Sequence, residues 1–171
     1  MVRLRIRHGL ALAALVGALT AAACYDSDTP IDATPQTETA PALFGAWRCL
    51  PLGGKVTDKP ATMTIAHLGQ RAYSVVFDDD RYEGYTSAVK RKTIANLKIV
   101  GSGEAKPWSL VRYEFLRRDV LQLQVLRDKA LPEAIPPSGL RKVVESLGDS
   151  VYVDFAVCVR ASEVEESRPT G

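Results

Sequence analysis

Few side chains of the kinds that do chemistry stand in this chain. It has two histidines, and because His8 lies in an apolar N-terminal segment, His67 is the only candidate base or metal ligand of that type. One histidine cannot build the usual multi-histidine metal site. The motif that exposes a nucleophile at a sharp turn is absent, and so is a second catalytic member. We therefore predict no enzyme, no catalytic residue, no bound metal and no cofactor, with His67 on the surface at the end of a strand.

Two charged clusters have simple structural interpretations. The carboxylates of Asp78, Asp79, Asp80 and Glu83 are oxygen ligands of the kind that calcium prefers. Their spacing lacks the regular loop of a strong calcium motif, so we interpret them as a solvated hairpin turn. The basic run 90–92 could contact anionic headgroups or a glycan, and we interpret it as a charged turn.

The first 23 residues have the form of a secretion signal. Three arginines between residues 3 and 7 precede an apolar run from Gly9 to Ala23. A basic start, a short apolar middle and small residues at the end are typical of a cleaved signal peptide. The run is shorter than the roughly 20 residues that a membrane-spanning helix needs. We therefore predict a signal peptide over residues 1–23, in preference to an uncleaved anchor helix.

The small residues of the signal directly precede a cysteine, in the order Ala21-Ala22-Ala23-Cys24. This arrangement resembles a bacterial lipoprotein signal, although Ala21 stands where such signals usually carry leucine. The resemblance implies that Cys24 becomes the first mature residue and carries lipid. Tyr25 follows it in place of the aspartate that favours the inner membrane. We thus expect a lipid anchor in the bacterial envelope, at the outer membrane and facing the periplasm. The alternative is an ordinary cleaved signal followed by a free cysteine.

The lipoprotein resemblance also indicates how the remaining two cysteines pair. With Cys24 used for lipid, Cys49 and Cys158 are the only two left. In an oxidising compartment their simplest arrangement is a Cys49–Cys158 disulfide. Two buried free thiols are the alternative.

The charge balance of the mature chain excludes a nucleic-acid partner. Residues 1–23 hold three of the 22 basic side chains and none of the 20 acidic ones, so the rest of the chain is close to neutral. Nucleic-acid binding would require a clustered basic face. Residues 24–41 are rich in Thr, Pro and acid with almost nothing to bury, and we expect a disordered tether from the lipidated Cys24. We predict one folded domain over residues 42–160 and a frayed tail over residues 161–171.

The folded part shows short strands with turn signals between them. Alternation of apolar and polar residues is clearest around residues 121–125. A helical spacing of apolar residues occurs only between Ser138 and Gly148. The expected strands cover residues 43–50, 61–67, 73–78, 81–89, 93–100, 108–116, 121–125 and 151–160.

This order predicts a mainly β fold: an antiparallel barrel of about eight strands with one helix before the last strand. Closing the barrel places the first strand beside the last, which agrees with the Cys49–Cys158 pairing. One detail disagrees, because Cys158 lies opposite to the apolar row of its own strand. A β-bulge, a disulfide outside the barrel or a slipped register could each account for it.

The segment Gly45-Ala46-Trp47 is similar to the Gly-x-Trp motif on the first strand of lipocalins. Lipocalins also have a helix before their final strand and a late arginine over the tryptophan, here Arg160. The resemblance implies a lipocalin-like, or more broadly calycin-like, barrel of the kind found in small bacterial lipoproteins. The alternative reading of Trp47 and Arg160 is core packing with a cation over a ring.

Two functions remain open at this stage. The first is a barrel that binds a small apolar or amphipathic ligand through inward aromatic side chains, for which the candidates are Trp47, Tyr73, Phe77, Tyr113 and Phe115. The second is an interaction with an envelope protein, as an inhibitor, immunity factor or assembly accessory. A cavity of roughly 300 Å³ or more would favour a ligand. A filled interior would favour a protein partner.

Overall fold

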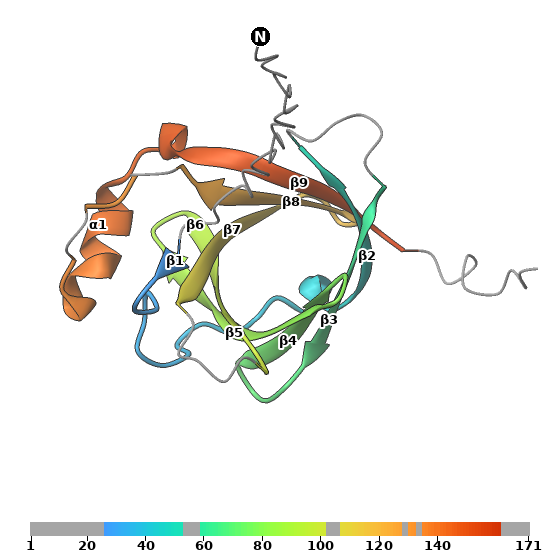
Figure 1. The fold of residues 1–171 in the computed structure, drawn as a ribbon, viewed down its shortest axis with the longest axis horizontal. Helices are drawn as coiled ribbons and strands as arrows, with labels where there is room; N and C mark the ends of the chain where they lie inside the picture. The colour runs from blue at the N-terminus through green and yellow to red at the C-terminus, as the bar shows by residue number, and fades with distance from the viewer. Residues whose placement is uncertain (1–25, 53–58, 102–106, 128–129, 133–134, 162–171) are drawn as a thin grey trace, which may run out of the picture.

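The computed structural model describes residues 26–52, 59–101, 107–127, 130–132 and 135–161, and it shows a closed antiparallel β-barrel (Figure 1). Cys24, the predicted signal peptide and residues 162–171 lie outside the described residues. Eight strands form the barrel, and their bounds are β2 (Gly45–Pro51), β3 (Ala61–His67), β4 (Ala72–Phe77), β5 (Asp80–Val89), β6 (Lys92–Ile99), β7 (Trp108–Arg117), β8 (Val120–Leu126) and β9 (Tyr152–Arg160). The predicted fold class is therefore confirmed.

Each barrel strand pairs with the next one along the chain, and β2 pairs with β9 to close the sheet. A ninth strand, β1 (Asp26–Ser27), pairs with the beginning of β7. Closure leaves none of the eight barrel strands as an edge, so their backbone groups are paired within the barrel. The turns follow the sequence pattern: Asp78 and Lys90 adopt positive φ angles of 50° and 55° in the β4–β5 and β5–β6 hairpins.

One helix, α1 (Leu140–Ser146), precedes the last strand and lies outside the barrel wall (Figure 1). Two 3-10 turns flank it, Pro137–Gly139 and Asp149–Val151. The helix is shorter than the predicted segment because the chain enters it through a 3-10 turn. Its buried residues Leu140 and Val144 pack on the outer face of the barrel, in a second apolar cluster that is separate from the barrel interior.

The basic run interpreted as a charged turn attaches this helix to the barrel. Lys90 Nζ donates to the carbonyl of Glu145 at 2.9 Å, and Lys92 Nζ donates to the carbonyls of Val144 and Leu147. These carbonyls belong to the last helical turn and its end, where cations are favourable. Burial lowers the pKa of Lys92.

The seam between β2 and β9 contains the predicted disulfide. Cys49 and Cys158 are register partners, both fully buried, and joined by a disulfide bond. The orientation of Cys158 is explained by a β-bulge: Leu123 pairs with Ala156, whereas Gln124 pairs with Asp154, so one residue of β9 is unpaired. The inward row of β9 therefore changes phase, and the bridge lies on the inside of the wall.

Residues 26–41, which were expected to form part of a disordered tether over residues 24–41, belong to the folded domain. Ile31 is only 5% exposed, and its N–H donates to Asn96 Oδ1 at 2.8 Å. Asp32 binds the guanidinium of Arg141 through both carboxylate oxygens at 2.8 Å. One buried isoleucine and one ion pair hold this segment against the outer wall, although its composition gave little sign of either. The folded domain thus begins before residue 42.

Candidate functional site

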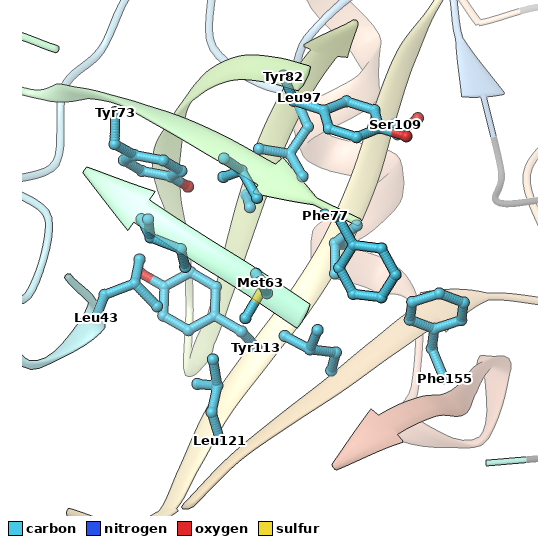
Figure 2. A pocket seen from close by; sticks show the side chains of 15 residues that line it. Leu43, Met63, Tyr73, Phe77, Tyr82, Leu97, Ser109, Tyr113, Leu121 and Phe155 are labelled. Atoms are coloured by element: carbon cyan, nitrogen blue, oxygen red, sulfur yellow. The ribbon is translucent and has the colours of Figure 1, made fainter. Parts of the chain in front are cut away.

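An apolar cavity of about 110 Å³ lies inside the barrel (Figure 2). Its walls are inward side chains from β3 to β9, with Leu43 at one end. Aliphatic residues supply much of the surface, among them Met63, Ile65, Val75, Leu97 and Leu123. A closed sheet produces such a cavity because every second residue of each strand points to the axis.

The structure divides the five predicted ligand-contacting residues into two groups. Tyr73, Phe77 and Tyr113 line the cavity. Trp47 and Phe115 belong to the surrounding apolar cluster without lining it, with their ring centroids 6.2 Å apart. The cavity also has aromatic walls that the sequence did not single out, Tyr82 and Phe155.

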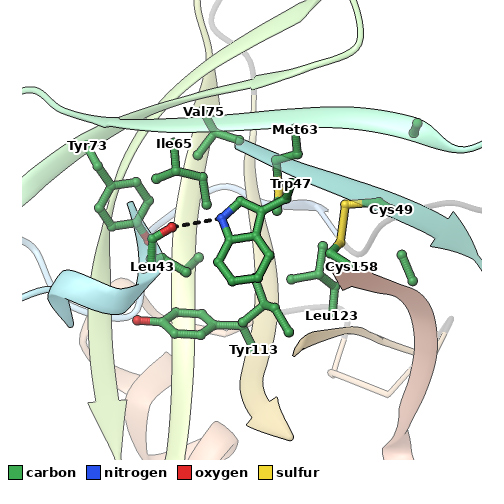
Figure 3. Packing of buried hydrophobic residues seen from close by; sticks show 14 residues of the cluster. Leu43, Trp47, Cys49, Met63, Ile65, Tyr73, Val75, Tyr113, Leu123 and Cys158 are labelled. Atoms are coloured by element: carbon green, nitrogen blue, oxygen red, sulfur yellow. Dashed lines mark hydrogen bonds between the residues drawn. A yellow bond between two sulfur atoms is a disulfide. The ribbon is translucent and has the colours of Figure 1, made fainter. Parts of the chain in front are cut away.

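Trp47 instead helps to fill one end of the barrel (Figure 3). It is 1% exposed, and its Nε1 donates to the carbonyl of Leu43 at 3.0 Å. The guanidinium carbon of Arg160 lies 4.3 Å from the centroid of the indole ring. Arg160 Nη1 also donates to the carbonyl of Phe44 at 2.9 Å, and Nη2 donates to the carbonyl of Ala42.

Gly45 allows this arrangement for two reasons. Its φ angle is +123°, which residues with a side chain rarely adopt. A Cβ at this position would also lie 2.7 Å from Arg160 Nη1. The glycine therefore lets the arginine approach the backbone over the tryptophan.

Three buried hydroxyls form a chain within the barrel. Thr86 Oγ1 lies 3.3 Å from the Tyr73 hydroxyl and 3.0 Å from the Tyr113 hydroxyl. Thr86 and Tyr73 are each 1% exposed, and Tyr113 is 5% exposed. Burial raises the pKa of Tyr73 and of Tyr113, so both phenols are neutral at physiological pH. Figure 2 shows the two phenol rings on the same side of the cavity.

A second pocket, a cleft of about 340 Å³, lies at the same end of β5 and β6 as the hydroxyl chain. Thr37, Glu38 and Ala40 of the N-terminal segment border it, together with polar and apolar side chains of β5, β6 and β7. Tyr113 lines both this cleft and the inner cavity. The cleft is polar over about half of its lining, unlike the cavity.

The residues missed by sequence reasoning were missed for identifiable reasons. Tyr82 lay in a predicted strand, but nothing marked which of its faces is inward. Phe155 is itself the unpaired residue of β9, at the bulge where the simple alternation fails. Thr86 is a small polar residue of a kind usually exposed, and its inward position becomes evident only from its contacts with Tyr73 and Tyr113.

The side chains considered for catalysis and metal binding do not converge. His67 is exposed and stacks on Phe44, with ring centroids 3.5 Å apart. Asp78 Oδ1 accepts from the N–H of Thr62 at 2.8 Å, as a turn residue. Across the described residues, no three His, Cys, Asp or Glu side chains are grouped as metal ligands. Over the same part of the chain, no helix has the length and apolar character needed to cross a bilayer.

Comparison of the chain with protein-family models, with curated proteins and with solved structures returned no match in any of the three.

Proposed function

We propose that this protein is a non-enzymatic binding barrel for a small apolar or amphipathic ligand. The observation that supports this function is the apolar cavity inside a closed barrel. Protein interiors are packed as densely as organic crystals, and voids larger than a water molecule are few. An apolar void loses dispersion contacts on its lining, and an apolar guest restores them. Small apolar cavities of this order do bind small apolar molecules.

The size of the cavity limits the ligand. At about 110 Å³ it is below the roughly 300 Å³ given above as favouring a ligand, which is the size of pockets that enclose drug-sized molecules, so an enclosed ligand is smaller. It holds a short chain or a small ring, or the end of a longer amphipathic molecule. The lining contributes no cationic or anionic side chain, so the enclosed part of the ligand is uncharged.

The test uses a substitution that fills the cavity and measures which small molecules no longer copurify with the protein. Ala95 lines the cavity from β6, and Ala95→Leu adds three carbon atoms there. Ala66 is exposed on β3, so Ala66→Leu makes the same change away from the cavity. Organic extracts of the purified proteins are compared by mass spectrometry. We expect a small noncovalent molecule with the wild type and with Ala66→Leu, but not with Ala95→Leu. Identical extracts from all three proteins would contradict the proposal.

We also propose that the barrel is exported and attached to the bacterial envelope through lipid on Cys24. The support is the signal-like order of residues 1–24, with a basic start, an apolar run and small residues before the cysteine. Mass spectrometry of the N-terminal peptide of the native protein tests this. We expect an acylated Cys24 and no residues 1–23. An N-terminus without acyl mass would refute the lipid anchor and leave the binding function untouched.

A protein partner is the second candidate, and a specific surface favours it. Leu50 and Val159 lie on the outer face of the adjacent strands β2 and β9, where they are 54% and 46% exposed. Leu50 pairs with Val157, so it is a diagonal neighbour of Val159 on this face. Exposed apolar side chains that lie near each other on a sheet are typical of contact surfaces. A Leu50→Lys, Val159→Lys variant should lose any crosslinked envelope protein while it keeps the cavity ligand. Unchanged crosslinking would contradict the use of this surface.

A further inference from the structure

The cavity is closed at one end of the barrel and open at the other. Leu43, Tyr73 and Tyr113 line the closed end and are at most 5% exposed. The lining residues at the other end are partly exposed, and they are Phe77, Tyr82, Leu97, Ser109 and Phe155. Figure 2 shows the two groups on opposite sides of the cavity. We call the second group the mouth, because a guest from outside meets these side chains first.

Exposed apolar side chains border the mouth on two sides. Leu52 is 41% exposed, and its N–H donates to the carbonyl of Phe155 at 2.8 Å. Val100 is 46% exposed, and its N–H donates at 2.8 Å to the carbonyl of Arg81, the residue before Tyr82. Exposed apolar side chains around an opening are typical of a surface that contacts a partner or a membrane. The rim of the mouth is therefore suited to an apolar surface.

The N-terminal strand β1 lies at this mouth. Asp26 pairs with Ser109, and Ser27 pairs with Trp108. Cys24 precedes Asp26 by two residues, so the Cα atoms of these two residues are at most about 7 Å apart, whatever the path between them. Lipid on Cys24, as proposed above, therefore starts beside the mouth. A connection of only two residues holds the mouth against the membrane.

The side chains near β1 fit the same orientation. Trp108 is partly exposed, and Lys98 Nζ lies 5.6 Å from the centroid of its ring. Tryptophan and lysine favour the boundary between membrane and water, because each has an apolar body and a polar end. The hairpin 78–80 beside Phe77 carries three exposed aspartates, which an anionic surface would repel. The mouth thus fits a zwitterionic membrane surface.

We infer that the mouth lies on the membrane and that the cavity takes the end of an acyl chain from a membrane phospholipid. This inference rests on the proposed binding function and on the lipid anchor, and it specifies the ligand class. The lining has no charged side chain, so the headgroup stays outside at the rim. A volume of about 110 Å³ accommodates only the end of the chain. The chain end passes from one apolar environment to another, and by filling the void it restores dispersion contacts.

Photocrosslinking in vesicles tests which residues the chain reaches. The protein with its N-terminal anchor is reconstituted in phosphatidylcholine vesicles that contain a phosphatidylcholine with a diazirine at the end of one acyl chain. Light converts the diazirine to a carbene, which inserts into the nearest side chain, and peptide mass spectrometry locates the adducts. We expect adducts on cavity residues such as Met63 and Tyr113. A diazirine near the headgroup should instead label the rim, at Leu52 or Val100.

Two variants make the assignment to the cavity specific. Ala95→Leu fills the cavity from β6 and should lose the cavity adducts of the chain-end probe. Ala66→Leu makes the same change on the exposed face of β3 and should keep them. Cavity adducts that survive in Ala95→Leu at the level of Ala66→Leu would overturn the inference.

The two tryptophans of the chain report the orientation separately. Trp108 lies beside the mouth, whereas Trp47 is buried at the closed end. Bromine quenches tryptophan fluorescence at near contact. Phosphatidylcholine that is brominated near the headgroup should therefore quench part of the wild-type emission and leave the emission of Trp108→Phe unchanged. Wild-type emission that is not quenched would overturn the inference.

A short alkyl diazirine, added to the same vesicles, separates the inference from the binding function. Cavity adducts from this short probe, but not from the chain-end phospholipid, would overturn the inference and leave the binding function standing. Cavity adducts from neither probe would count against the binding function itself.

Discussion

Reducing the Cys49–Cys158 disulfide should remove a large part of the stability of the barrel. The two cysteines are 109 residues apart, so the bridge closes most of the described domain into one loop. In the chain-entropy model, opening a loop of this length raises the conformational entropy of the unfolded chain. This lowers the free energy of unfolding by about 4.8 kcal/mol at 25 °C. Whole domains are stable by only about 5–15 kcal/mol, so the loss is a major fraction.

Urea unfolding with and without a phosphine reductant measures the effect, because oxidised and reduced protein differ in no other side chain. With a slope of about 1.5 kcal/mol per molar urea, the midpoint should fall by about 3 M. A Cys49→Ala, Cys158→Ala variant should unfold near the reduced protein and should not respond to reductant. A midpoint that moves by less than 1 M, which is about 1.5 kcal/mol, would show that the bridge does little to restrict the unfolded chain and would refute this reasoning.

Three further predictions concern the ends and the outer wall of the barrel. Arg160→Met should lower the free energy of unfolding by about 2 kcal/mol in urea titrations, because it removes the cation over Trp47 and its bonds to backbone carbonyls. Asp32→Asn should cost about 1 kcal/mol, since its arginine partner is partly exposed, while Asp28→Asn at an exposed position should cost almost nothing. Burial, with a smaller contribution from the charge of Asp32, raises the pKa of Tyr85 to about 12. The tyrosine loses its proton near pH 10 in the unfolded chain but only near pH 12 in the folded protein. The contribution of Tyr85 to the free energy of unfolding should therefore be constant below pH 10 and fall between pH 10 and 12. Tyr85→Phe should make that fall smaller.

The strands could be predicted because this fold repeats one simple pattern. In β8, Leu121, Leu123 and Val125 are buried between the less buried Gln122 and Gln124, as the alternation indicates. A meandering barrel pairs each strand with its sequence neighbour, so the order of the strands already gives the topology. The disulfide then fixed which strands meet at closure, and the structure confirms that pairing.

The cavity could not be predicted at the same level, because it depends on single positions. In β9 the apolar row of Val153, Val157 and Val159 looks continuous, yet the bulge puts Val159 outside and Cys158 inside. A bulge is a choice of local pairing, and a smooth apolar row does not reveal it. Thr86 illustrates the opposite case, since a polar residue in an inward position is recognised only once its tyrosine partners are in place.

The N-terminal segment shows a further limit of composition. Its polar character predicted disorder, but stability depends on particular contacts as well as on averages. Asn96 is fully buried on the outer wall, where it accepts from Ile31 and donates to the hydroxyl of Ser87 at 2.9 Å. A buried side-chain amide with partners on both sides is a strong local anchor. The partner on the barrel lies 65 residues further along the chain, so no local pattern could indicate it.

The register of the closing seam is specified twice, and the cavity depends on it. Trp47 pairs with Arg160, and Cys49 pairs with Cys158, two residues later on β2 and two residues earlier on β9. Both pairs are joined by their side chains, one by a cation over a ring and the other by a covalent bond. A slip of one residue would reverse the faces of β9, because side chains alternate with a period of two. Such a slip would break both pairs at once and turn Val159 into the interior. The same two contacts that close the barrel therefore also determine which side chains face its cavity.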